Sequence, residues 1–306
     1  MKLPLSIDVG GTSIKVGLFD NNGKLLKKYS VPTIITKGND DRNVINQIID
    51  IIYKEKDEND ILSVGIGMPG PVVDGVVLGA HNLHLNEINL QNIIKAEFPD
   101  LYIKVLNDAN AACLGEAKFG SGFGYKNIVL ITIGTGIGCG IMINNKIIEG
   151  KSGSTGEIGH ICVEKDGLLC KCGKTGCLEK YASASAISNL ATRRYNEYGK
   201  SVEKVTCEEV FKDYERGFNP AIQAVNEACY YLSIGIGNII NILNPDVIII
   251  GGGVSEAKES LLEPIKFYLK EFTFYGTKET LVLTAKLHND AALYGLSEIG
   301  NDWIYK

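Results

Sequence analysis

Apolar positions along the chain follow two patterns. At 5–26 and again at 129–148, apolar residues alternate with polar or small ones around glycines, which predicts strands joined by tight turns. Between these segments, the charged stretch at 43–56 predicts a helix, and a second helix and strand lead to VLNDANAACLGEAKFG. Strands that alternate with helices favour an α/β architecture.

The two strand-rich segments repeat one plan. LSIDVGGTSIKVGLFDNNGKLL and VLITIGTGIGCGIMINNKII each contain an apolar strand, a Gly/Thr-rich turn, a second strand, a turn with Asn or Asp, and a third strand. Each copy therefore indicates the start of its own domain. We expect a smaller N-terminal α/β domain over residues 1–117 plus about 287–306, and a larger C-terminal α/β domain over residues 118–286.

The second half of the chain is mostly helical by pattern. Residues 182–242 predict helices, and NPDVIIIGGGVSEAKE then predicts a buried strand, three glycines and a helix start. The final HNDAALYGLSEIG predicts a helix with small residues on one side, which suits close packing. We expect this last helix to return to the first domain.

Two uncharged runs approach the length of a membrane span. Glycines interrupt the run at 127–145, and glycines and asparagines interrupt the run at 228–245, so we predict that neither crosses a membrane. The N-terminus lacks the apolar core and the cleavage site of a signal peptide. We therefore expect a cytoplasmic protein whose thiols stay reduced.

Composition and net charge disfavour a protein that binds nucleic acid or a membrane surface. A chain of 306 residues with 45% hydrophobic content can bury one large or two medium cores without disulfides. Its net charge of −5 gives no electrostatic footprint for nucleic acid or an anionic membrane surface. We expect neither as a partner.

The motif DVGGTSIK places an aspartate at the end of a strand, before glycines and hydroxyl residues. Backbone N–H groups of such a turn can bind phosphate oxygens, and the aspartate can hold Mg²⁺ directly or through water. An ordinary glycine-rich hairpin fits the same residues. The candidate nucleotide-binding residues of this motif are Asp8, Gly10, Gly11, Thr12 and Lys15.

A second turn of the same type, ITIGTGIGCG, stands at the matching place in the repeat and contributes Gly134, Thr135 and Gly136. Two such turns that face each other across a cleft favour nucleotide binding more strongly than either does alone. Neither is a GxxxxGK[ST] sequence, and neither opens a helix as a GxGxxG turn does, so NAD binding is disfavoured.

The segment NDAN follows an apolar strand, where its side chains can enter a cleft. Asp108 in this position suits the deprotonation or orientation of an alcohol that attacks a γ-phosphate, and Asn107 could bind neighbouring hydroxyls. The same residues also fit a helix N-cap, and both interpretations can hold together.

Three cysteines fall within LLCKCGKTGCLEK. Cys170, Cys172 and Cys177, together with the preceding His160, form a closed set typical of structural zinc. A disulfide is disfavoured in a reducing compartment, and no base singles out one thiol for catalysis. The five remaining cysteines stand singly and are expected to be small buried residues: Cys113, Cys139, Cys162, Cys207 and Cys229.

Two carboxylates flank the cysteine cluster. Glu157 lies in STGEIGH and Glu179 follows the last cysteine by two residues. Beside a metal-fixed loop they could bind sugar hydroxyls, although a single carboxylate of this kind is more often a solvated surface charge.

With these segments assembled, the chain resembles the ROK family (repressor, open reading frame, kinase) of sugar kinases and sugar-responsive repressors. DVGGTSIKVGLFD, GMPGPVVDG, NDAN and ITIGTGIGCG are similar to its phosphate, hinge and catalytic segments, and GEIGH with CKCGKTGCLE is similar to its signature. The resemblance covers essentially the whole chain. It implies the actin-like, ribonuclease-H-like α/β fold of a two-domain ATPase with a deep inter-domain cleft.

The resemblance also implies residue roles. Asp108 would be the general base, and the adenosine side of the nucleotide would lie against Gly252 and Gly253 in DVIIIGGGV. The implied zinc ligands are His160, Cys170, Cys172 and Cys177. The implied sugar-binding residues are Asn82, Asn107, Glu157, His160 and Glu179.

These roles predict ATP-dependent phosphorylation of the C6 hydroxyl of an aldohexose, with Mg²⁺ and a structural Zn²⁺. Glucose is the expected substrate, because several segments resemble the glucokinase branch. Alternatives are N-acetylmannosamine or another N-acyl hexosamine, then fructose or allose. This chain has His84 and Leu85 where several glucokinases of the family carry an aromatic residue, which leaves the choice of sugar open.

Two further alternatives belong to other function classes. Sugar-sensing repressors of the family carry a helix-turn-helix of roughly 60 to 80 residues ahead of the first phosphate motif, whereas seven residues precede Asp8 here. An actin- or chaperone-like ATPase would have no reason to carry the zinc and glutamate signature. The family habit predicts a homodimer.

Overall fold

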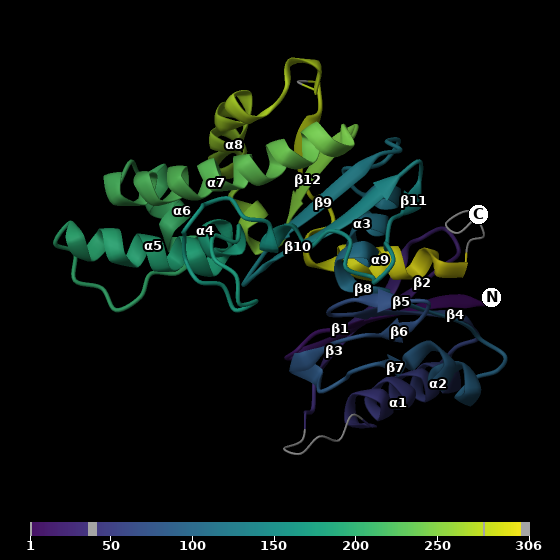
Figure 1. Ribbon diagram of the computed structural model, residues 1–306. Helices are drawn as coiled ribbons and strands as arrows, with labels where there is room; N and C mark the ends of the chain where they lie inside the picture. The colour runs from purple at the N-terminus through teal and green to yellow at the C-terminus, as the bar shows by residue number, and fades with distance from the viewer. Residues whose placement is uncertain (1, 36–41, 278, 301–306) are drawn as a thin grey trace. The chain divides into compact units, whose positions relative to one another are not determined.

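The structure, a computed structural model, describes residues 2–35, 42–277 and 279–300 and contains two compact units (Figure 1). Unit 1 comprises Met1–Lys126, Gly140–Thr155 and Asp290–Lys306, and unit 2 comprises Asn127–Cys139 and Gly156–Asn289. Units defined by compactness need not be folding domains, so the expected domain boundaries stay predictions. Residues 301–306 of the predicted N-terminal domain lie outside the described residues.

A five-stranded sheet organises unit 1, in the order β3-β2-β1-β4-β8. Strand β1 pairs antiparallel with β2, which pairs antiparallel with β3, whereas β4 and β8 add in parallel. The alternating segment at 5–26 therefore forms the predicted hairpins. The strand bounds are β1 Leu3–Val9, β2 Ser13–Phe19, β3 Leu25–Pro32, β4 Ile61–Met68 and β8 Tyr102–Asn107.

Helices cover both faces of this sheet (Figure 1). On one face, α1 (Arg42–Glu58) and α2 (Leu90–Glu97) bury apolar side chains such as Ile48, Ile52 and Ile94 in a core that they share with β1, β4 and β8. On the other face lie α3 (Asp108–Phe119) and α9 (Ala291–Ser297). Burying both faces removes apolar area from water, which stabilises the sheet.

Helix α9 packs closely on α3 and on the sheet because glycines line its path. Cβ atoms added at Gly17 and Gly65 would meet Leu293 and Leu296 of α9, and one added at Gly115 of α3 would lie 2.0 Å from the Ala291 carbonyl oxygen. The predicted return of the last helix to the N-terminal part of the chain is visible in these contacts. The α-helix itself is shorter than HNDAALYGLSEIG, because 3₁₀ turns η5 (His288–Asp290) and η6 (Glu298–Gly300) flank it.

A small sheet of short strands follows β4 in the chain: β5 (Val72–Val73), β6 (Val76–Val77) and β7 (Ile88–Asn89). The 3₁₀ turn η1 (His81–Leu83) lies between β6 and β7 in the sequence. Gly70, with a φ of +85°, allows this excursion to pass close to Gly79, whose carbonyl oxygen would lie 2.2 Å from a Cβ at Gly70.

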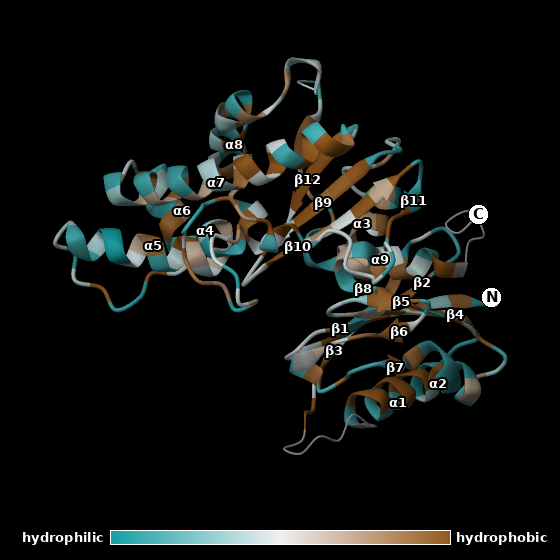
Figure 2. Cartoon of the chain, in the orientation of Figure 1, coloured by the Kyte–Doolittle hydropathy of each residue, from teal (hydrophilic) through white to brown (hydrophobic). Residues whose placement is uncertain are grey.

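The second five-stranded sheet has the order β11-β10-β9-β12-β13. Its strands are β9 (Ile128–Ile133), β10 (Ile137–Ile143), β11 (Lys146–Ile147), β12 (Val247–Gly251) and β13 (Leu281–Thr284), and the boundary between the units passes through β10. Its order matches that of the first sheet strand for strand. The repeat inferred from sequence is therefore a repeat of topology, and β9 and β12 are mostly apolar (Figure 2).

Helices make up most of the rest of unit 2. After α4 (Glu179–Ala182) come α5 (Ala184–Glu197), α6 (Cys207–Glu215), α7 (Asn219–Leu243) and α8 (Glu259–Phe272). The predicted helical region at 182–242 is confirmed. After β12 the chain forms the 3₁₀ turn η3 (Gly253–Ala257) before α8, because Lys258 takes a left-handed φ of +49°. The helix start expected directly after the three glycines is thus delayed.

The two uncharged runs form parts of the fold. Residues 127–145 contain β9 and β10, and residues 228–245 contain the end of α7. Across residues 2–35, 42–277 and 279–300, no helix combines the length and apolar character that a membrane crossing requires.

Replacing Gly115 by alanine should destabilise unit 1. The added Cβ would lie 2.0 Å from the Ala291 carbonyl oxygen, so α3 and α9 must separate, and overpacking of this kind costs about 1–3 kcal/mol. Urea unfolding measures the change. Gly276→Ala is the matched control, because its Cβ would come no closer than 3.8 Å to the Phe274 ring. Equal unfolding free energies for the two variants would contradict the close packing.

Candidate functional site

The carboxylate of Asp108 lies where β8 ends and α3 begins. Asn107 is the N-cap of α3, and its side chain accepts a hydrogen bond from the Asn110 N–H at 3.0 Å. The Asn107 amide donates to the Gly70 carbonyl at 3.0 Å and to Asp108 Oδ1 at 3.1 Å. The Ala109 N–H donates to the same oxygen at 2.8 Å. The cap therefore also fixes the direction of the Asp108 carboxylate.

The two interpretations of NDAN are divided between its residues. Asn107 is the cap, as the helix signal predicted, and Asp108 is the carboxylate that it orients. Both N–H donors of the Asn107 amide are engaged, so a sugar hydroxyl could only donate to its Oδ1. The role of Asn107 as a sugar ligand stays a prediction, whereas its contact with Asp108 is direct.

The pKa of Asp108 is raised to about 6. The main cause is burial, which removes water from the carboxylate, and the charge of Asp8 adds to it; hydrogen bonds from Ala109 and Asn107 oppose the rise. Because the pKa stays below 7, the group is ionised at neutral pH. Because it lies close to 7, the carboxylate is a stronger base than an ordinary aspartate, which suits proton transfer from an alcohol.

Asp8 faces Lys15 across the first hairpin of unit 1. The two residues are register partners, and Lys15 Nζ lies 3.4 Å from Asp8 Oδ2. Burial raises the pKa of Asp8, and Lys15 opposes the rise. The charge of Asp8 raises the pKa of Asp108, and that of Asp290 raises the pKa of Asp8. A divalent cation would offset such repulsion, so a carboxylate at this position fits the expected Mg²⁺.

The turn that follows Asp8 is tied to the strand beside it. The Gly10 N–H donates to the Ser13 carbonyl at 3.0 Å, and Thr33 Oγ1 donates to the Gly10 carbonyl at 2.7 Å. A Cβ added at Gly11 would meet no other atom within 4 Å. The backbone of this turn is therefore fixed in shape and open on the side where a side chain would stand, as a phosphate cradle requires.

The corresponding turn of unit 2 joins β9 to β10. Its carbonyl groups are engaged by the start of α5, since the Ala184 N–H donates to Gly134 at 2.9 Å and Ser185 Oγ donates to Thr135 at 3.1 Å. A Cβ at Gly134 would meet nothing within 4 Å, whereas one at Gly136 would lie 2.4 Å from Glu179 Oε2. The two glycines thus serve different needs, an open backbone and close packing.

The glycines after β12 differ in the same way. Gly252 has a φ of +79°, and its added Cβ would lie 2.4 Å from the Ile133 carbonyl oxygen, so only glycine fits beside the end of β9. An added Cβ at Gly253 would meet nothing within 4 Å. The turn after β12 therefore lies against the end of β9, directly before the open backbone of Gly134.

The four candidate metal ligands come together in unit 2. The ligand atoms of His160, Cys170, Cys172 and Cys177 all lie within 4.8 Å of one another. His160 Nδ1 is 3.7 Å from Cys170 Sγ, and the Sγ atoms of Cys172 and Cys177 are 3.5 Å apart. A tetrahedral zinc with Zn–S bonds of about 2.3 Å separates its sulfur ligands by about 3.8 Å. The donor set fits a zinc ion.

A zinc ion at this site would have to displace the proton of Cys177. Burial raises the pKa of this thiol to about 12, and the neighbouring thiols of Cys172 and Cys170 add to the rise. A thiol with this pKa keeps its proton at neutral pH unless a cation stabilises the thiolate. Zinc would supply that stabilisation, and its binding would release the proton.

The expectation that the other cysteines are buried is wrong for Cys162. Cys113, Cys139 and Cys229 are buried and Cys207 is half-buried, but Cys162 is exposed. It lies on a short bridge to Cys177, at the edge of the metal-ligand group. Cys162 stands apart from the three clustered cysteines in the sequence, so spacing alone did not predict that it lies opposite Cys177.

The candidate sugar-binding residues of unit 2 lie around His160. Its Nε2 is 3.9 Å from Glu157 Oε2, while its Nδ1 faces the thiols. Glu179 accepts a hydrogen bond from the Ile137 N–H at 3.1 Å, which ties it to the β9–β10 turn. A Cβ at Gly159 would lie 3.6 Å from Glu179 Cβ. One metal ion could therefore hold the imidazole and the two carboxylates in fixed relative positions.

The cysteine loop is also attached to the helices of unit 2. The hydroxyl of Tyr181 accepts a hydrogen bond from the Leu168 N–H at 2.6 Å, and that of Tyr231 in α7 donates to Glu164 Oε2 at 2.8 Å. The two tyrosine rings lie 4.3 Å apart. These contacts position the loop independently of a metal. The sequence did not predict which residues would form them.

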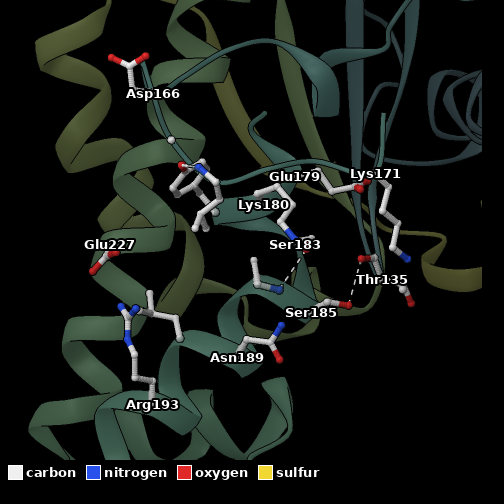
Figure 3. Close-up of a pocket in the computed structure, with 15 residues that line it drawn as sticks. Thr135, Asp166, Lys171, Glu179, Lys180, Ser183, Ser185, Asn189, Arg193 and Glu227 are labelled. Carbon is white, nitrogen blue, oxygen red and sulfur yellow. Dashed lines mark hydrogen bonds between the residues drawn. The ribbon is translucent and has the colours of Figure 1, made fainter. Parts of the chain in front are cut away.

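A cavity of about 690 Å³ opens beside the β9–β10 turn, entirely within unit 2 (Figure 3). Thr135 and Glu179 line it together with a polar face of α5 that carries Ser185, Asn189 and Arg193. These three residues were not among those predicted from the sequence. Their spacing of four places polar side chains on one helix face, and that spacing was the available signal.

The sequence-predicted residues thus fall into groups within each unit. In unit 1, Asp8, Lys15, Asn107 and Asp108 are linked by contacts or charge, and Asn82 is exposed in η1. In unit 2, the metal-ligand set, Glu157 and Glu179 surround His160. Their predicted roles rest on these arrangements and on the resemblance.

The known proteins that this chain resembles point to one family. A family model described as "ROK family" matches residues 4–302. A glucokinase from Halalkalibacterium halodurans is 36% identical in an alignment that covers 99% of this chain and 94% of that protein.

Solved structures give the same picture. A ROK family glucokinase from Streptomyces griseus, in complex with glucose and AMPPNP, matches with a TM-score of 0.81 and 32% identity over 97% of this chain and 98% of that one. A ROK family transcriptional regulator, a homolog of the E. coli MLC protein, matches with a TM-score of 0.88 and 27% identity over 97% of this chain and 77% of that one.

Asp108→Asn should stabilise the protein above pH 6. Folding raises the Asp108 pKa from its ordinary 3.8 to about 6, so the favourable contribution of this group is complete below pH 3.8 and is lost as the pH rises through 6. The neutral amide avoids that loss, which amounts to at most about 3 kcal/mol at pH 8 and shrinks toward pH 4. Urea unfolding at several pH values measures it. The control Asp60→Asn, at an exposed carboxylate, should change little at any pH, and a pH-independent effect of Asp108→Asn would contradict the burial argument.

Proposed function

The chain belongs to the ROK family, and from that premise we propose that it is an ATP-dependent glucokinase, which transfers the γ-phosphoryl group of ATP to the C6 hydroxyl of glucose. Its fold is the actin-like, ribonuclease-H-like α/β fold expected from the sequence. The observation that carries the proposal is the oriented carboxylate of Asp108, with its pKa of about 6.

Asp108 acts as the general base in this proposal. Oδ1 is held by Asn107 and Ala109, so the carboxylate keeps one orientation while a substrate hydroxyl approaches. The hydroxyl donates a hydrogen bond to the carboxylate and transfers its proton as the oxygen attacks the γ-phosphorus. Positioning and partial deprotonation are the main tasks left to the protein in phosphoryl transfer, because little covalent chemistry is required of it.

The nucleotide phosphates are assigned to the two glycine turns. Gly10, Gly11 and Thr12 follow Asp8 in unit 1, and Gly134, Thr135 and Gly136 occupy the equivalent turn of unit 2, with Gly252 and Gly253 on the adenosine side. The open space over Gly11, Gly134 and Gly253 supports backbone contact with a ligand. Asp8 would hold Mg²⁺ directly or through water, and the ion would neutralise charge on the phosphates. Lys15 adds a positive charge beside Asp8.

Sugar recognition is assigned to Asn82 and Asn107 of unit 1 and to Glu157, His160 and Glu179 of unit 2. Carboxylates accept hydrogen bonds from pairs of sugar hydroxyls, and an imidazole fixed through one nitrogen can contact a hydroxyl through the other. His160 has this arrangement, because Nδ1 faces the thiols and Nε2 faces Glu157.

Zinc is proposed as a structural ion, held by His160, Cys170, Cys172 and Cys177. It would close the loop that contains Glu179, two residues after Cys177, and it would set the tautomer of His160. The tyrosine contacts attach the loop to α4 and α7, so the ion would refine the positions of the side chains in a loop that is already anchored.

Other sugars and a sensing role fit less well. A glucokinase is 36% identical over 99% of the chain, which supports glucose over N-acyl hexosamines, fructose and allose. A transcriptional regulator has a similar fold, so the fold alone does not separate a kinase from a repressor. The basic, oriented carboxylate of Asp108 favours the kinase. The homodimer, the cytoplasmic location and the lack of a nucleic-acid partner stay predictions.

The purified protein should phosphorylate glucose faster than N-acetylmannosamine, N-acetylglucosamine, mannose, fructose or allose in a coupled assay of ADP release. Asp108→Asn should lower kcat by about 10²–10⁴-fold, because the amide cannot accept the proton, while glucose binding by calorimetry is kept. In the wild type, kcat/KM should fall as the pH drops below about 6, where Asp108 becomes protonated.

Two outcomes would count against this function. Unchanged turnover in Asp108→Asn would remove the assigned base, and ADP release that no sugar stimulates would remove the kinase itself. Asp246→Asn, in unit 2 before β12, is the control and should keep the wild-type pH profile.

Cys172→Ser should reduce the zinc content and raise the glucose KM by about tenfold or more, because His160 and Glu179 lose their common anchor. Nucleotide binding should change little, since the glycine turns hold no metal ligand. Emission spectrometry measures zinc per chain, and steady-state kinetics gives both KM values. Cys207→Ser, at a half-buried thiol of α6, should change neither. Zinc content and glucose KM that both stay at wild-type values in Cys172→Ser would rule out the zinc site.

A further inference from the structure

Cys162 and Cys177 face each other in the cysteine loop of unit 2. They are partners in an antiparallel bridge. Two backbone hydrogen bonds flank the pair, from the Val163 N–H to the Gly176 carbonyl at 2.8 Å and from the Leu178 N–H to the Ile161 carbonyl at 3.0 Å. This pattern defines a non-hydrogen-bonded pair, in which the Cα atoms are about 4.5 Å apart and both side chains leave the same face.

That spacing suits a disulfide. Cα atoms joined by a disulfide lie about 4.4–6.8 Å apart, so the backbone needs little rearrangement. Cys162 Sγ lies 3.5 Å from the Glu164 carbonyl oxygen, and a rotation about χ1 of Cys162 would break this weak contact. The cross-strand Cβ distance of such pairs, about 4.5–5.5 Å, must shorten by up to about 1 Å.

The two thiols differ in accessibility and in role. Cys162 is exposed and lies outside the group of four candidate ligands, whereas Cys177 is buried and belongs to it. Of these two thiols, a dissolved oxidant therefore reaches Cys162 first. A bond from Cys162 to Cys177 would remove one ligand from the metal, two residues before Glu179.

We propose that Cys162 is a peroxide-reactive thiol that forms a disulfide with Cys177 and thereby releases the bound zinc ion. This inference rests on the zinc site of the proposed function. The Cys162 sulfur takes one oxygen atom from hydrogen peroxide and becomes a sulfenic acid; the O–O bond breaks, and the other oxygen leaves as water. The Cys177 thiolate then attacks the Cys162 sulfur, the S–S bond forms, and hydroxide departs as the S–O bond breaks.

The atoms and electrons of this reaction balance. One thiol, one zinc-bound thiolate and one hydrogen peroxide give one disulfide, one zinc ion, one water and one hydroxide. The two sulfurs lose two electrons in total, and the peroxide gains them. A dithiol reductant with added zinc reverses the change.

The competing pair lies inside the ligand set. Cys172 is exposed like Cys162, and its Sγ lies 3.5 Å from that of Cys177, but oxidation of that pair must begin at a thiolate that the metal binds. Cys162 needs no such loss to begin the reaction. Outside the loop, burial raises the pKa of Cys207 and of Cys229 to about 12, so neither offers much thiolate.

Loss of zinc would loosen the sugar-binding group. His160 would lose the contact that fixes its Nδ1, and Glu179 would lose the anchor at Cys177. The hydrogen bond from the Ile137 N–H to Glu179 and the tyrosine contacts would remain, so the loop would stay attached while its side chains gain freedom. Oxidation is therefore expected to weaken sugar binding without unfolding the protein.

The test uses the full chain loaded with zinc, as wild type, Cys162→Ser and the control Cys207→Ser. Zinc release during treatment with hydrogen peroxide is followed with 4-(2-pyridylazo)resorcinol, and disulfides are mapped by mass spectrometry of unreduced peptides. The wild type and the control should release about one zinc per chain and yield a peptide joined at Cys162 and Cys177. Cys162→Ser should lose that peptide and release its zinc more slowly.

Equal zinc release by the wild type and Cys162→Ser would overturn the proposal, and so would a wild-type disulfide between Cys172 and Cys177. Wild-type protein without zinc would overturn the metal part, while the peptide map still reads the reaction of Cys162. Neither readout uses kinase activity, so failure here is distinct from failure of the proposed function. Because Cys162 is exposed, the serine variant should melt at the wild-type temperature, and the wild-type peptide map does not depend on any variant.

Discussion

The burial of one carboxylate beside another is the physical constraint on which the proposed chemistry depends. Asp108 loses water at the junction of β8 and α3, and Asp8 adds a like charge, so the pKa of Asp108 is raised to about 6. The helix cap at Asn107 holds this carboxylate in one direction and partly opposes the rise. A carboxylate whose burial raises its pKa in this way is typical of a functional site, because a stronger base accepts a proton more readily.

The parallel strands of unit 1 bring these two acids to one edge of the sheet. Strands β1, β4 and β8 run in the same direction, so Asp8 near the end of β1 and Asp108 directly after β8 are delivered to the same side. Gly67 of β4 lies beside Asp8, since an added Cβ would be 3.4 Å from Asp8 Oδ1. The second sheet repeats this strand order but carries other side chains, so one topology serves two roles.

In unit 2, one loop combines functions that the sequence suggested separately. Glu179 belongs to the candidate sugar-binding group, accepts a hydrogen bond from the start of β10 and follows the ligand Cys177 by two residues. Glu179 therefore contacts the β9–β10 turn and also belongs to the candidate sugar-binding group. The tyrosine contacts with α4 and α7 attach the loop to the helices, which leaves the metal to set side-chain positions.

The sequence by itself determined the strands, the repeat and the ligand spacing. Apolar segments on both sides of glycine- and asparagine-containing turns gave β1 to β3 and β9 to β11, because such turns end one strand and begin the next. C-x-C-x₄-C with His160 gave the metal-ligand group, because a short loop can close on one ion. Only the tertiary structure decided the rest. It turned both donors of the Asn107 amide inward, delayed α8 behind a left-handed Lys258, and placed Cys162 opposite Cys177. These features depend on which backbone groups meet across the fold, and residues far apart in sequence, or a single left-handed residue, leave no periodic trace in the chain.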